Sequence, residues 1–249
     1  MAKKKQRLKE NKVLLEGKRL CEEAMHSRWF EPIELIIDPS RIKEDLCFQR
    51  LIQDAESRQI PLYRATSSDF AVFSATEHSP GVACVGRPLS PPLATWMTTA
   101  SGIWVALDSL RDPGNLGTVL RTAAWFGVAG VLTSPTTVEY TNPKVVRGSM
   151  GGMFHLPVFT EVDLFEWLPR FHESGFRISA AAVRGGVVPQ QVLPTDRELL
   201  LIGSEAFGLD PRLEKEIDQR LTISRIGGGE SLNAALAAAI ILYEWSKEK

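Results

Sequence analysis

Residues 231–245 read Ser-Leu-Asn-Ala-Ala-Leu-Ala-Ala-Ala-Ile-Ile-Leu-Tyr-Glu-Trp, and three consecutive glycines, residues 227–229, stand just before them. Apolar residues recur at helical spacing from Leu232 to Tyr243, which predicts an alanine-rich C-terminal helix. Ser231 is expected to cap this helix, because its hydroxyl can accept a hydrogen bond from a free backbone N–H group. The glycines let the backbone turn or approach a ligand closely. We therefore expect binding or chemistry at this helix start, although an ordinary capped helix explains the same pattern.

Strand and helix patterns alternate upstream of this helix, from Gly102 onward. Residues 103–107 form a nearly continuous apolar run, as expected of a strand buried on both faces. Further strands are expected at 130–133, 156–159, 177–183, 199–202 and 221–223, with helices at 117–126, 143–150, 164–172 and 211–218. This alternation predicts an α/β fold with a parallel, doubly wound sheet.

The first third of the chain carries a shorter alternation. Helices are expected at 11–28, 43–58 and 68–73, and strands at 34–38, 60–63 and 81–85. The pattern predicts a small α/β domain over residues 11–87, separate from a second domain over residues 102–249. Residues 88–101, which contain three prolines and several small polar residues, are expected to be a linker.

Composition restricts the class of protein. Hydrophobic residues make up 44% of the chain and charged residues 24%, so the chain can bury a core as soluble globular proteins do. No apolar run is long enough for a membrane span. The three cysteines are widely spaced and odd in number, so they indicate neither a disulfide framework nor a metal site. We expect a reduced, metal-free cytoplasmic protein.

Charge is distributed unevenly along the chain. The whole sequence has a net charge of −1, yet residues 1–20 contain eight basic and two acidic residues. We expect residues 1–10 to be a basic disordered arm. Such an arm suits a polyanionic partner, and a tail that only aids solubility explains the charge equally well.

Two further segments carry polar residues where strands are expected to end. Asp112-Pro-Gly-Asn115 is typical of a turn between a strand and a helix, and Arg121 follows inside that helix. Gly203-Ser-Glu205 comes directly after the apolar strand at 199–202. Ligands bind in the crevice at the carboxyl ends of the strands in open α/β sheets, which makes the Asp112–Asn115 turn a candidate binding position. Taken singly, a turn asparagine, a surface arginine and a loop carboxylate also explain these residues.

Together the three segments resemble, in order and spacing, the signature motifs of the SpoU/TrmH family of RNA 2′-O-ribose methyltransferases, which belong to the SPOUT class. The matching patterns are Asn115-x5-Arg-Thr-Ala, Gly203-x-Glu-x-x-Gly-Leu and Glu230-Ser-Leu-Asn. The resemblance covers residues 100–247. A weaker one, over residues 10–87, is to the ribosomal-protein-like substrate-binding domain of such enzymes. The resemblance implies a deep trefoil knot near the C-terminus, which periodicity cannot indicate.

The resemblance also implies the chemistry. S-adenosylmethionine would donate a methyl group to a ribose 2′-hydroxyl, a group that only RNA offers, and the N-terminal domain favours rRNA over tRNA. The implied catalytic residues are Asn115, Arg121, Glu205, Ser231 and Asn233, and the implied cofactor-binding residues are Gly203, Ile223 and Leu232. In similar enzymes the arginine at this position is proposed to deprotonate the ribose 2′-hydroxyl. A guanidinium stays protonated at neutral pH, so orienting the RNA phosphate and lowering the pKa of the hydroxyl is the physically easier role, and the sequence does not decide between the two. No metal is needed.

One departure from the family pattern concerns the third motif. The family usually has Ile-Pro-Met where this chain has Ile223-Ser-Arg225. Loss of the proline should loosen the loop, and the arginine either faces RNA or disturbs the cofactor pocket. A non-catalytic RNA-binding scaffold with a degenerate cofactor site is therefore the alternative, although retention of the motif residues argues against it. A Rossmann oxidoreductase is disfavoured because no Gly-x-Gly-x-x-Gly follows the first strand.

The C-terminal helix also bears on assembly. Its apolar residues lie nearly all round, including Leu236, Ile240 and Trp245, and such a helix needs cover on more than one side. In related enzymes the knotted regions pack together and each pocket borrows residues from the partner. We therefore expect a homodimer through the catalytic domain.

Overall fold

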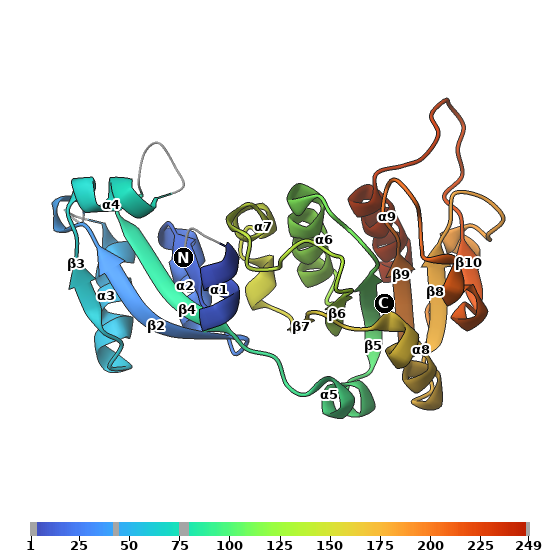
Figure 1. The fold of residues 1–249 in the computed structure, drawn as a ribbon, viewed down its shortest axis with the longest axis horizontal. Helices are drawn as coiled ribbons and strands as arrows, with labels where there is room; N and C mark the ends of the chain where they lie inside the picture. The colour runs from blue at the N-terminus through green and yellow to red at the C-terminus, as the bar shows by residue number, and fades with distance from the viewer. Residues whose placement is uncertain (1–3, 42–44, 75–79, 248–249) are drawn as a thin grey trace.

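The computed structural model describes residues 4–41, 45–74 and 80–247. It contains two sheets, each at the centre of one lobe of an elongated molecule (Figure 1). The N-terminal sheet has four strands in the order β1-β4-β2-β3, and the C-terminal sheet has six in the order β10-β8-β9-β5-β6-β7. Strand β7 lies at the edge of its sheet that is nearer the N-terminal lobe (Figure 1).

The N-terminal lobe mixes parallel and antiparallel strands. Its elements are α1 (Lys4–Glu10), β1 (Val13–Glu16), α2 (Lys18–His26), β2 (Phe30–Ile37), η1 (Pro39–Arg41), α3 (Leu46–Ser57), β3 (Leu62–Arg64), α4 (Ser67–Phe73) and β4 (Val82–Pro88). Strands β1 and β2 run antiparallel to β4, and β3 runs parallel to β2. The expected α/β order is present, except that a single helix over 11–28 was wrong. Val13 and Leu15 alternate inward as a strand, and Gly17, with φ +102°, turns the chain before α2.

The expected basic arm is helical where the structure describes it. The Arg7 guanidinium donates two hydrogen bonds to the Glu139 carboxylate, at 2.7 and 2.8 Å, and the two side chains are only 5% and 6% exposed. Helix α1 is thereby held on the C-terminal lobe. The prediction of disorder is therefore wrong over residues 4–10, because a long-range ion pair orders them; residues 1–3 lie outside the described residues.

The proline-rich stretch between the lobes is also partly ordered. It contains α5 (Leu93–Thr99), whose Met97 is buried against the C-terminal lobe. The Trp96 indole donates to the Ala129 carbonyl at 3.0 Å, and Arg197 donates to the Thr98 carbonyl at 2.9 Å. The expected linker is thus a segment packed on the second sheet.

The C-terminal lobe is the predicted parallel α/β sheet. Its elements are β5 (Gly102–Leu107), α6 (Pro113–Trp125), β6 (Gly130–Thr133), α7 (Pro143–Ser149), η2 (Gly152–Phe154), β7 (Val158–Phe159), α8 (Leu164–Glu173), β8 (Arg177–Ala181), η3 (Pro189–Gln191), β9 (Arg197–Ile202), η4 (Pro211–Glu216), β10 (Gln219–Leu221) and α9 (Ala234–Ser246). Every neighbouring pair of strands runs parallel, which confirms the predicted fold class. The trefoil knot stays a prediction from the resemblance.

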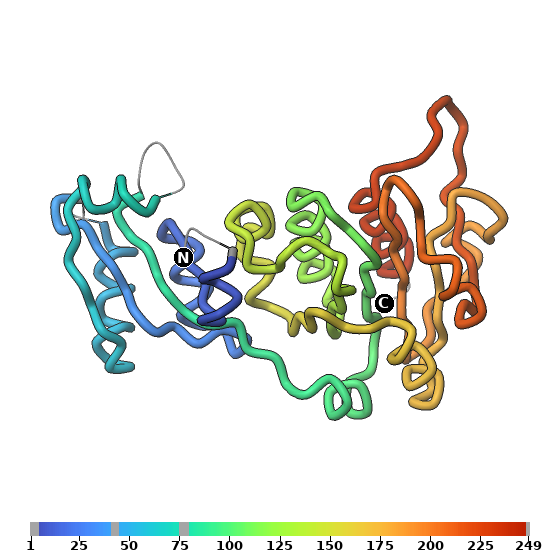
Figure 2. Tube along the Cα trace, in the orientation of Figure 1, coloured from blue at the N-terminus to red at the C-terminus, as the bar shows by residue number. Residues whose placement is uncertain are grey.

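Both faces of this sheet are covered by helices, as the apolar strands require. Along β5, Val105 and Leu107 pack in the layer that contains α6, α7 and α9, whereas Trp104 packs in the layer that contains α5 and α8. Figure 2 shows α6 and α9 beside each other on one face. None of the helices in the described part of the chain is long and apolar enough to span a lipid bilayer.

Candidate active site

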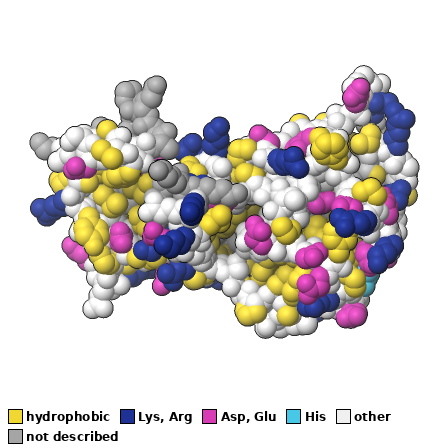
Figure 3. All heavy atoms as spheres, in the orientation of Figure 1, with side chains coloured by type: hydrophobic (Ala, Val, Ile, Leu, Met, Phe, Trp, Pro, Cys, Tyr) yellow, Lys and Arg dark blue, Asp and Glu magenta, His cyan; other side chains and the backbone are white. Residues whose placement is uncertain are grey.

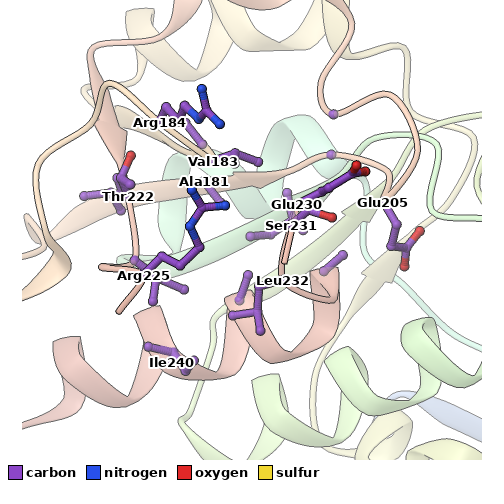
Figure 4. A pocket seen from close by; sticks show the side chains of 18 of the residues that line it. Ala181, Val183, Arg184, Glu205, Thr222, Arg225, Glu230, Ser231, Leu232 and Ile240 are labelled. Carbon is purple, nitrogen blue, oxygen red and sulfur yellow. The ribbon is translucent and has the colours of Figure 1, made fainter. Parts of the chain in front are cut away.

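A pocket of about 610 Å³ opens where three neighbouring strands end. Its walls include residues 181–184 at the end of β8, residues 202–205 at the end of β9 and residues 221–225 at the end of β10, and α9 contributes one more side (Figure 4). The carboxyl ends of parallel strands are the usual binding edge of such sheets, and the volume suits a small-molecule cofactor. The pocket therefore lies at the edge of the sheet where open α/β folds bind ligands.

Five of the sequence-predicted site residues line this pocket. They are Gly203, Glu205, Ile223, Ser231 and Leu232. Asn115 and Asn233 lie beside the pocket and are joined to it by hydrogen bonds, whereas Arg121 is not part of its lining.

A hydrogen-bonded relay brings the three motifs together at the pocket edge. The Asn233 side-chain amide donates to Asn115 Oδ1 at 2.9 Å, and the Asn115 amide in turn donates to Glu205 Oε1. Asn115 and Asn233 are 118 residues apart in the chain, and Asn115 and Glu205 are 90 apart. The resemblance alone had grouped these residues, and the fold now supplies the contact between them.

The helix start at Asn233 and the carboxylate of Glu205 are the two ends of the relay, and together they determine which group donates in each of its hydrogen bonds. The Asn233 carbonyl oxygen accepts from the backbone N–H groups of Ala235 and Leu236, at 2.9 and 3.2 Å, and backbone N–H groups can only donate. An ionised Glu205 carboxylate can only accept. Both asparagine amides must therefore point their NH₂ groups toward Glu205, so the first turn of α9 orients the carboxylate through two side chains.

The N-cap of the last helix is Asn233 and not Ser231. Helix α9 begins at Ala234, and the Asn233 side chain accepts both cap hydrogen bonds. The prediction that Ser231 caps the helix was wrong, because the helix begins at Ala234, two residues later than a cap at Ser231 requires. Ser231 is exposed and faces the pocket instead.

Asn115 owes its place to the start of α6. This helix begins at Pro113, four residues earlier than the apolar pattern predicted, and the Asp112 side chain caps it by accepting from the Asn115 N–H at 2.8 Å. Proline at the first helical position and aspartate at the cap favour such a start. Asn115 therefore lies on the first turn of the helix, facing Glu205.

Glu205 is carried by a tight turn. Ser204 and Gly208 exchange two backbone hydrogen bonds of 3.0 and 2.9 Å. A Cβ atom on Gly203 would lie only 2.2 Å from the Gly208 carbonyl carbon, and Gly208 itself has φ +71°. Gly203 was expected to let backbone approach a ligand. In this structure the backbone that approaches it is the turn's own, so glycine is needed here to close the turn.

A second contact anchors the segment that follows this turn. Asp108, which is nearly buried at the end of β5, accepts from the Asp210 N–H at 2.9 Å. The pKa of the Asp210 carboxyl lies below its ordinary value because the Arg212 side chain and backbone donate hydrogen bonds to it. The turn is thereby fixed at both of its ends.

Arg121 stands apart from this group. It lies on an exposed face of α6, and its side chain makes no hydrogen bond or ion pair with any residue that the structure describes. Its backbone packs against Gly152 of η2, where a Cβ atom would meet the Arg121 Cα at 2.7 Å. Within one chain, the structure does not bring Arg121 to the pocket with the other motif residues.

One wall of the pocket was missed by the sequence analysis. Ala181 is the last residue of β8, Val183 and Arg184 follow it, and the sequence had indicated only the end of a strand and a loop here. The available signal was its position at the carboxyl end of a parallel strand. Arg184 and Arg225 lie on one side of the pocket and Glu205 and Glu230 on the other, so the pocket is electrostatically polarised (Figure 4).

Metal ions require donor sets of several side chains that lie close together. Over residues 4–41, 45–74 and 80–247, no group of three or more His, Cys, Asp or Glu side chains has a geometry suited to a metal ion. The chemistry available at the pocket is that of carboxylates, amides, hydroxyls and guanidinium groups.

Comparison with known proteins assigns the fold and the motifs to a family. Residues 102–243 match the model of the SpoU rRNA Methylase family, and residues 14–92 match the RNA 2′-O ribose methyltransferase substrate-binding model. The chain belongs to the SpoU rRNA methylase family. The recognition made from the three motifs is confirmed: the protein is a methyltransferase of this family, which uses S-adenosylmethionine and acts on RNA.

Individual relatives extend over almost the whole chain. The 23S rRNA (guanosine(2553)-2′-O)-methyltransferase RlmP of Bacillus subtilis (strain 168) is 31% identical over 240 residues, which cover 96% of this chain and 90% of the relative. A TrmH-family structure from Porphyromonas gingivalis superposes with a TM-score of 0.83 at 27% identity, covering 100% of this chain and 94% of that one. An AdoMet-bound rRNA methyltransferase from Sinorhizobium meliloti has the same fold, with a TM-score of 0.86 at 24% identity over 99% and 91% of the two chains.

Proposed function

We propose that this protein methylates the 2′-hydroxyl of one nucleotide in 23S rRNA, with a guanosine as the first candidate because the Bacillus relative is named for one. The observation that carries the proposal is the relay from Asn233 through Asn115 to Glu205 at the edge of the pocket. A degenerate, non-catalytic scaffold would have no reason to keep three distant motifs hydrogen-bonded to one another.

The pocket fits S-adenosylmethionine in both size and chemistry. Ile223, Leu232 and Ile240 offer an apolar surface for the adenosine part. Carboxylates and guanidinium groups on opposite sides suit a ligand that carries a cationic sulfur, an ammonium and a carboxylate. We assign cofactor contacts to Gly203, Ile223 and Leu232, with Gly203 acting through the turn that it closes.

Bound S-adenosylmethionine would supply an electrophilic methyl group on a positively charged sulfur. The chain's own residues then have two tasks, which are to hold the ribose oxygen in line and to assist loss of its proton. Glu205, fixed by Asn115 and Asn233, presents a negative charge at the pocket edge, and Ser231 offers a hydroxyl there. Arg121 would orient an RNA phosphate.

We further propose that the catalytic unit is a homodimer, because Arg121 and a large apolar surface lie together outside the pocket. On α6, Trp125 is 83% exposed; on the neighbouring α9, Leu236 and Tyr243 are 52% and 53% exposed. A second copy covering this face of α6 and α9 would bury these side chains and bring Arg121 near the partner's pocket. The catalytic domain would then span residues 102–249.

The N-terminal lobe, residues 11–87, is assigned to RNA binding, with residues 88–101 as its connection. This follows the substrate-binding match over residues 14–92. Lys5 and Lys9 on α1 are exposed and available to phosphate, whereas Arg7 is committed to Glu139. Since 23S rRNA in a bacterium such as the Bacillus relative's source lies in the cytoplasm, we place the protein there.

Methyl transfer is tested with purified protein, S-adenosylmethionine carrying a labelled methyl group, and unmodified 23S rRNA transcript. We expect label in RNA at a single ribose, mapped by resistance of that linkage to alkaline hydrolysis. A Glu205→Gln variant of unchanged thermal stability is the matched control and should lose most of the rate. RNA binding without label, together with no cofactor binding by calorimetry, would favour the scaffold.

The dimer is tested by complementation between two inactive variants. Arg121→Ala and Glu205→Gln are co-expressed with different tags, and the heterodimer is purified through both tags. If Arg121 serves the partner's pocket, one of the two pockets is complete, and we expect roughly half the wild-type rate from a two-fold symmetric dimer. An inactive heterodimer would mean that Arg121 works in its own pocket, and a monomer in light scattering would remove the dimer altogether.

A further inference from the structure

The turn that carries Glu205 also carries a phenylalanine into solvent. Phe207 is 84% exposed, and its ring takes part in no aromatic or cation–π contact with a residue that the structure describes. Isolated apolar side chains are common on protein surfaces, so exposure alone carries little weight. What matters is how rigidly this ring is held and what stands beside it.

The turn holds Phe207 at a fixed place. Its N–H donates to the Ser204 hydroxyl at 3.1 Å, inside the turn that Ser204 and Gly208 close with their two backbone hydrogen bonds. Because Gly203 packs directly on the Gly208 backbone, the turn cannot relax without losing these contacts. Because the backbone of Phe207 is already fixed, only its two side-chain torsions become ordered on binding, so the loss of conformational entropy is small.

The neighbours of Phe207 belong to the pocket. Glu205, two residues earlier, lines the pocket and ends the relay, and Ser204 and Gly208 line it as well. Any ribose that reaches the Glu205 end of the pocket must bring its own base, or the adjacent one, close to this turn. Phe207 is therefore an apolar, planar surface at the place where the nucleotide has to be held.

Electrostatic attraction between basic side chains and RNA phosphates is a weak means of positioning the nucleotide in this protein. The face shown in Figure 3 has Lys and Arg side chains interspersed with Asp and Glu, rather than gathered in one basic surface. The whole chain has a net charge of −1. Stacking on an aromatic ring does not depend on net charge, and every nucleobase has a face to offer.

We propose that Phe207 stacks on a nucleobase of the substrate RNA and thereby positions the ribose that is methylated. The inference rests on the proposed function in that the substrate is RNA. It makes Phe207 a positioning residue for the reaction, distinct from the relay that orients Glu205.

Three substitutions at this position separate stacking from general apolar contact. Phe207→Trp keeps an aromatic ring, Phe207→Leu keeps only apolar volume, and Phe207→Ala removes both. Phe165→Ala is the matched control, since Phe165 is a partly exposed phenylalanine on α8, a helix on the opposite face of the sheet from α6 and α9. Because Phe207 is exposed, none of its substitutions should lower the melting temperature.

Binding is measured by fluorescence anisotropy with fluorescein-labelled oligouridylate and with the labelled 23S rRNA transcript. We expect Phe207→Ala and Phe207→Leu to weaken RNA binding by roughly 5- to 150-fold, the range that loss of one base–aromatic stack produces. Phe207→Trp and Phe165→Ala should bind as the wild type does. In methyl transfer the loss should appear as a higher KM for RNA, with affinity for S-adenosylhomocysteine unchanged.

Three results would overturn the proposal that Phe207 stacks on a nucleobase. Wild-type RNA affinity and KM in Phe207→Ala, or equal behaviour of the leucine and tryptophan variants, would overturn stacking. A change of oligomeric state in Phe207→Ala would also overturn it, because the ring would then belong to a subunit interface. If the wild type binds RNA but methylates none, the proposed function fails while the binding series still decides the role of Phe207.

Discussion

The two sides of the pocket are built very differently, although both are loops that follow parallel strands. The turn after β9 is closed by paired backbone hydrogen bonds, filled by its own backbone at Gly203, and tied to two other segments through Asn115 and Asp108. The loop after β10, residues 224–230, extends away from the body of the molecule as the orange-red segment at the upper right of Figure 1.

The contacts of the two loops explain the contrast. Over residues 224–230 the hydrogen bond that the structure records is internal, from Arg225 to the Gly229 carbonyl, and Ile226 is fully exposed. Added Cβ atoms at Gly227 and Gly228 would meet nothing within 4 Å. The relay side is therefore held in place by contacts with other segments of the chain, whereas the loop side has few such contacts. Catalysis needs side chains that are held in fixed positions, and entry of a cofactor needs a segment that can move.

The largest effect is expected from the hydrogen bonds of the relay side. Asn233→Asp keeps the helix cap, because its carboxylate still accepts from Ala235 and Leu236, but it cannot donate to Asn115. We expect unchanged thermal stability and methyl transfer slower by on the order of 100-fold, the cost of a small misplacement at a reacting centre. Single-turnover kinetics measures the rate.

Asn233→Ala serves as the control for that comparison. It removes the cap as well, so stability should fall by about 1 kcal/mol in addition to the loss of rate. A normal rate in Asn233→Asp would show that Asn233 acts only as a helix cap and that the relay has no catalytic role.

A smaller effect, mainly on stability, is expected when a methyl group is added inside the turn that Ser204 and Gly208 close. Gly203→Ala places a Cβ atom 2.2 Å from the Gly208 carbonyl carbon, so the turn must open. Overpacking of this kind costs about 1–3 kcal/mol, which should lower Tm by roughly 2–12 °C and weaken binding of S-adenosylhomocysteine. Calorimetry gives both quantities.

The matched substitution lies across the pocket. Gly228→Ala adds the same methyl group in open space, at a position without a positive φ, and should change stability by no more than about 0.5 kcal/mol. Equal losses in Gly203→Ala and Gly228→Ala would mean that the two sides are not different in kind.

The smallest effect is expected from restricting the backbone of the loop at residues 224–230. Ser224→Pro restores the proline that the family usually has, and the Ser224 N–H makes no hydrogen bond with a described residue that the change would break. Restricting one flexible position is worth about 0.4–1 kcal/mol, so cofactor affinity should rise roughly 2- to 5-fold. Titration calorimetry resolves such a change, and weaker binding would indicate that the loop must remain free.

Arg225→Met, the other half of the family pattern, separates charge from stiffness. If Arg225 disturbs the pocket, its replacement should also tighten cofactor binding. If Arg225 contacts RNA, cofactor affinity should stay constant while RNA affinity falls.

The sequence by itself determined those features that show as a repeating hydrophobic pattern within a single strand or helix. The apolar run at 103–107 and its later counterparts indicated a doubly covered parallel sheet, because a strand buried on both faces has no polar side. The three motifs, through their resemblance to a family, indicated the enzyme class. Of the eight site residues that they implied, five line the pocket (Gly203, Glu205, Ile223, Ser231 and Leu232), and Asn115 and Asn233 are joined to it by hydrogen bonds, whereas Arg121 lies apart. The helix cap expected at Ser231 is at Asn233.

Only the tertiary structure decided how distant segments meet. Periodicity reports which face of an element is buried and says nothing about a partner 118 residues away, such as Asn115 for Asn233. For the same reason Arg7 was taken for part of a solvated arm, when burial against Glu139 makes α1 a fixed helix. The wall formed by Ala181 and Arg184 likewise exists because β8 lies between β10 and β9, an order of strands that no local pattern carries.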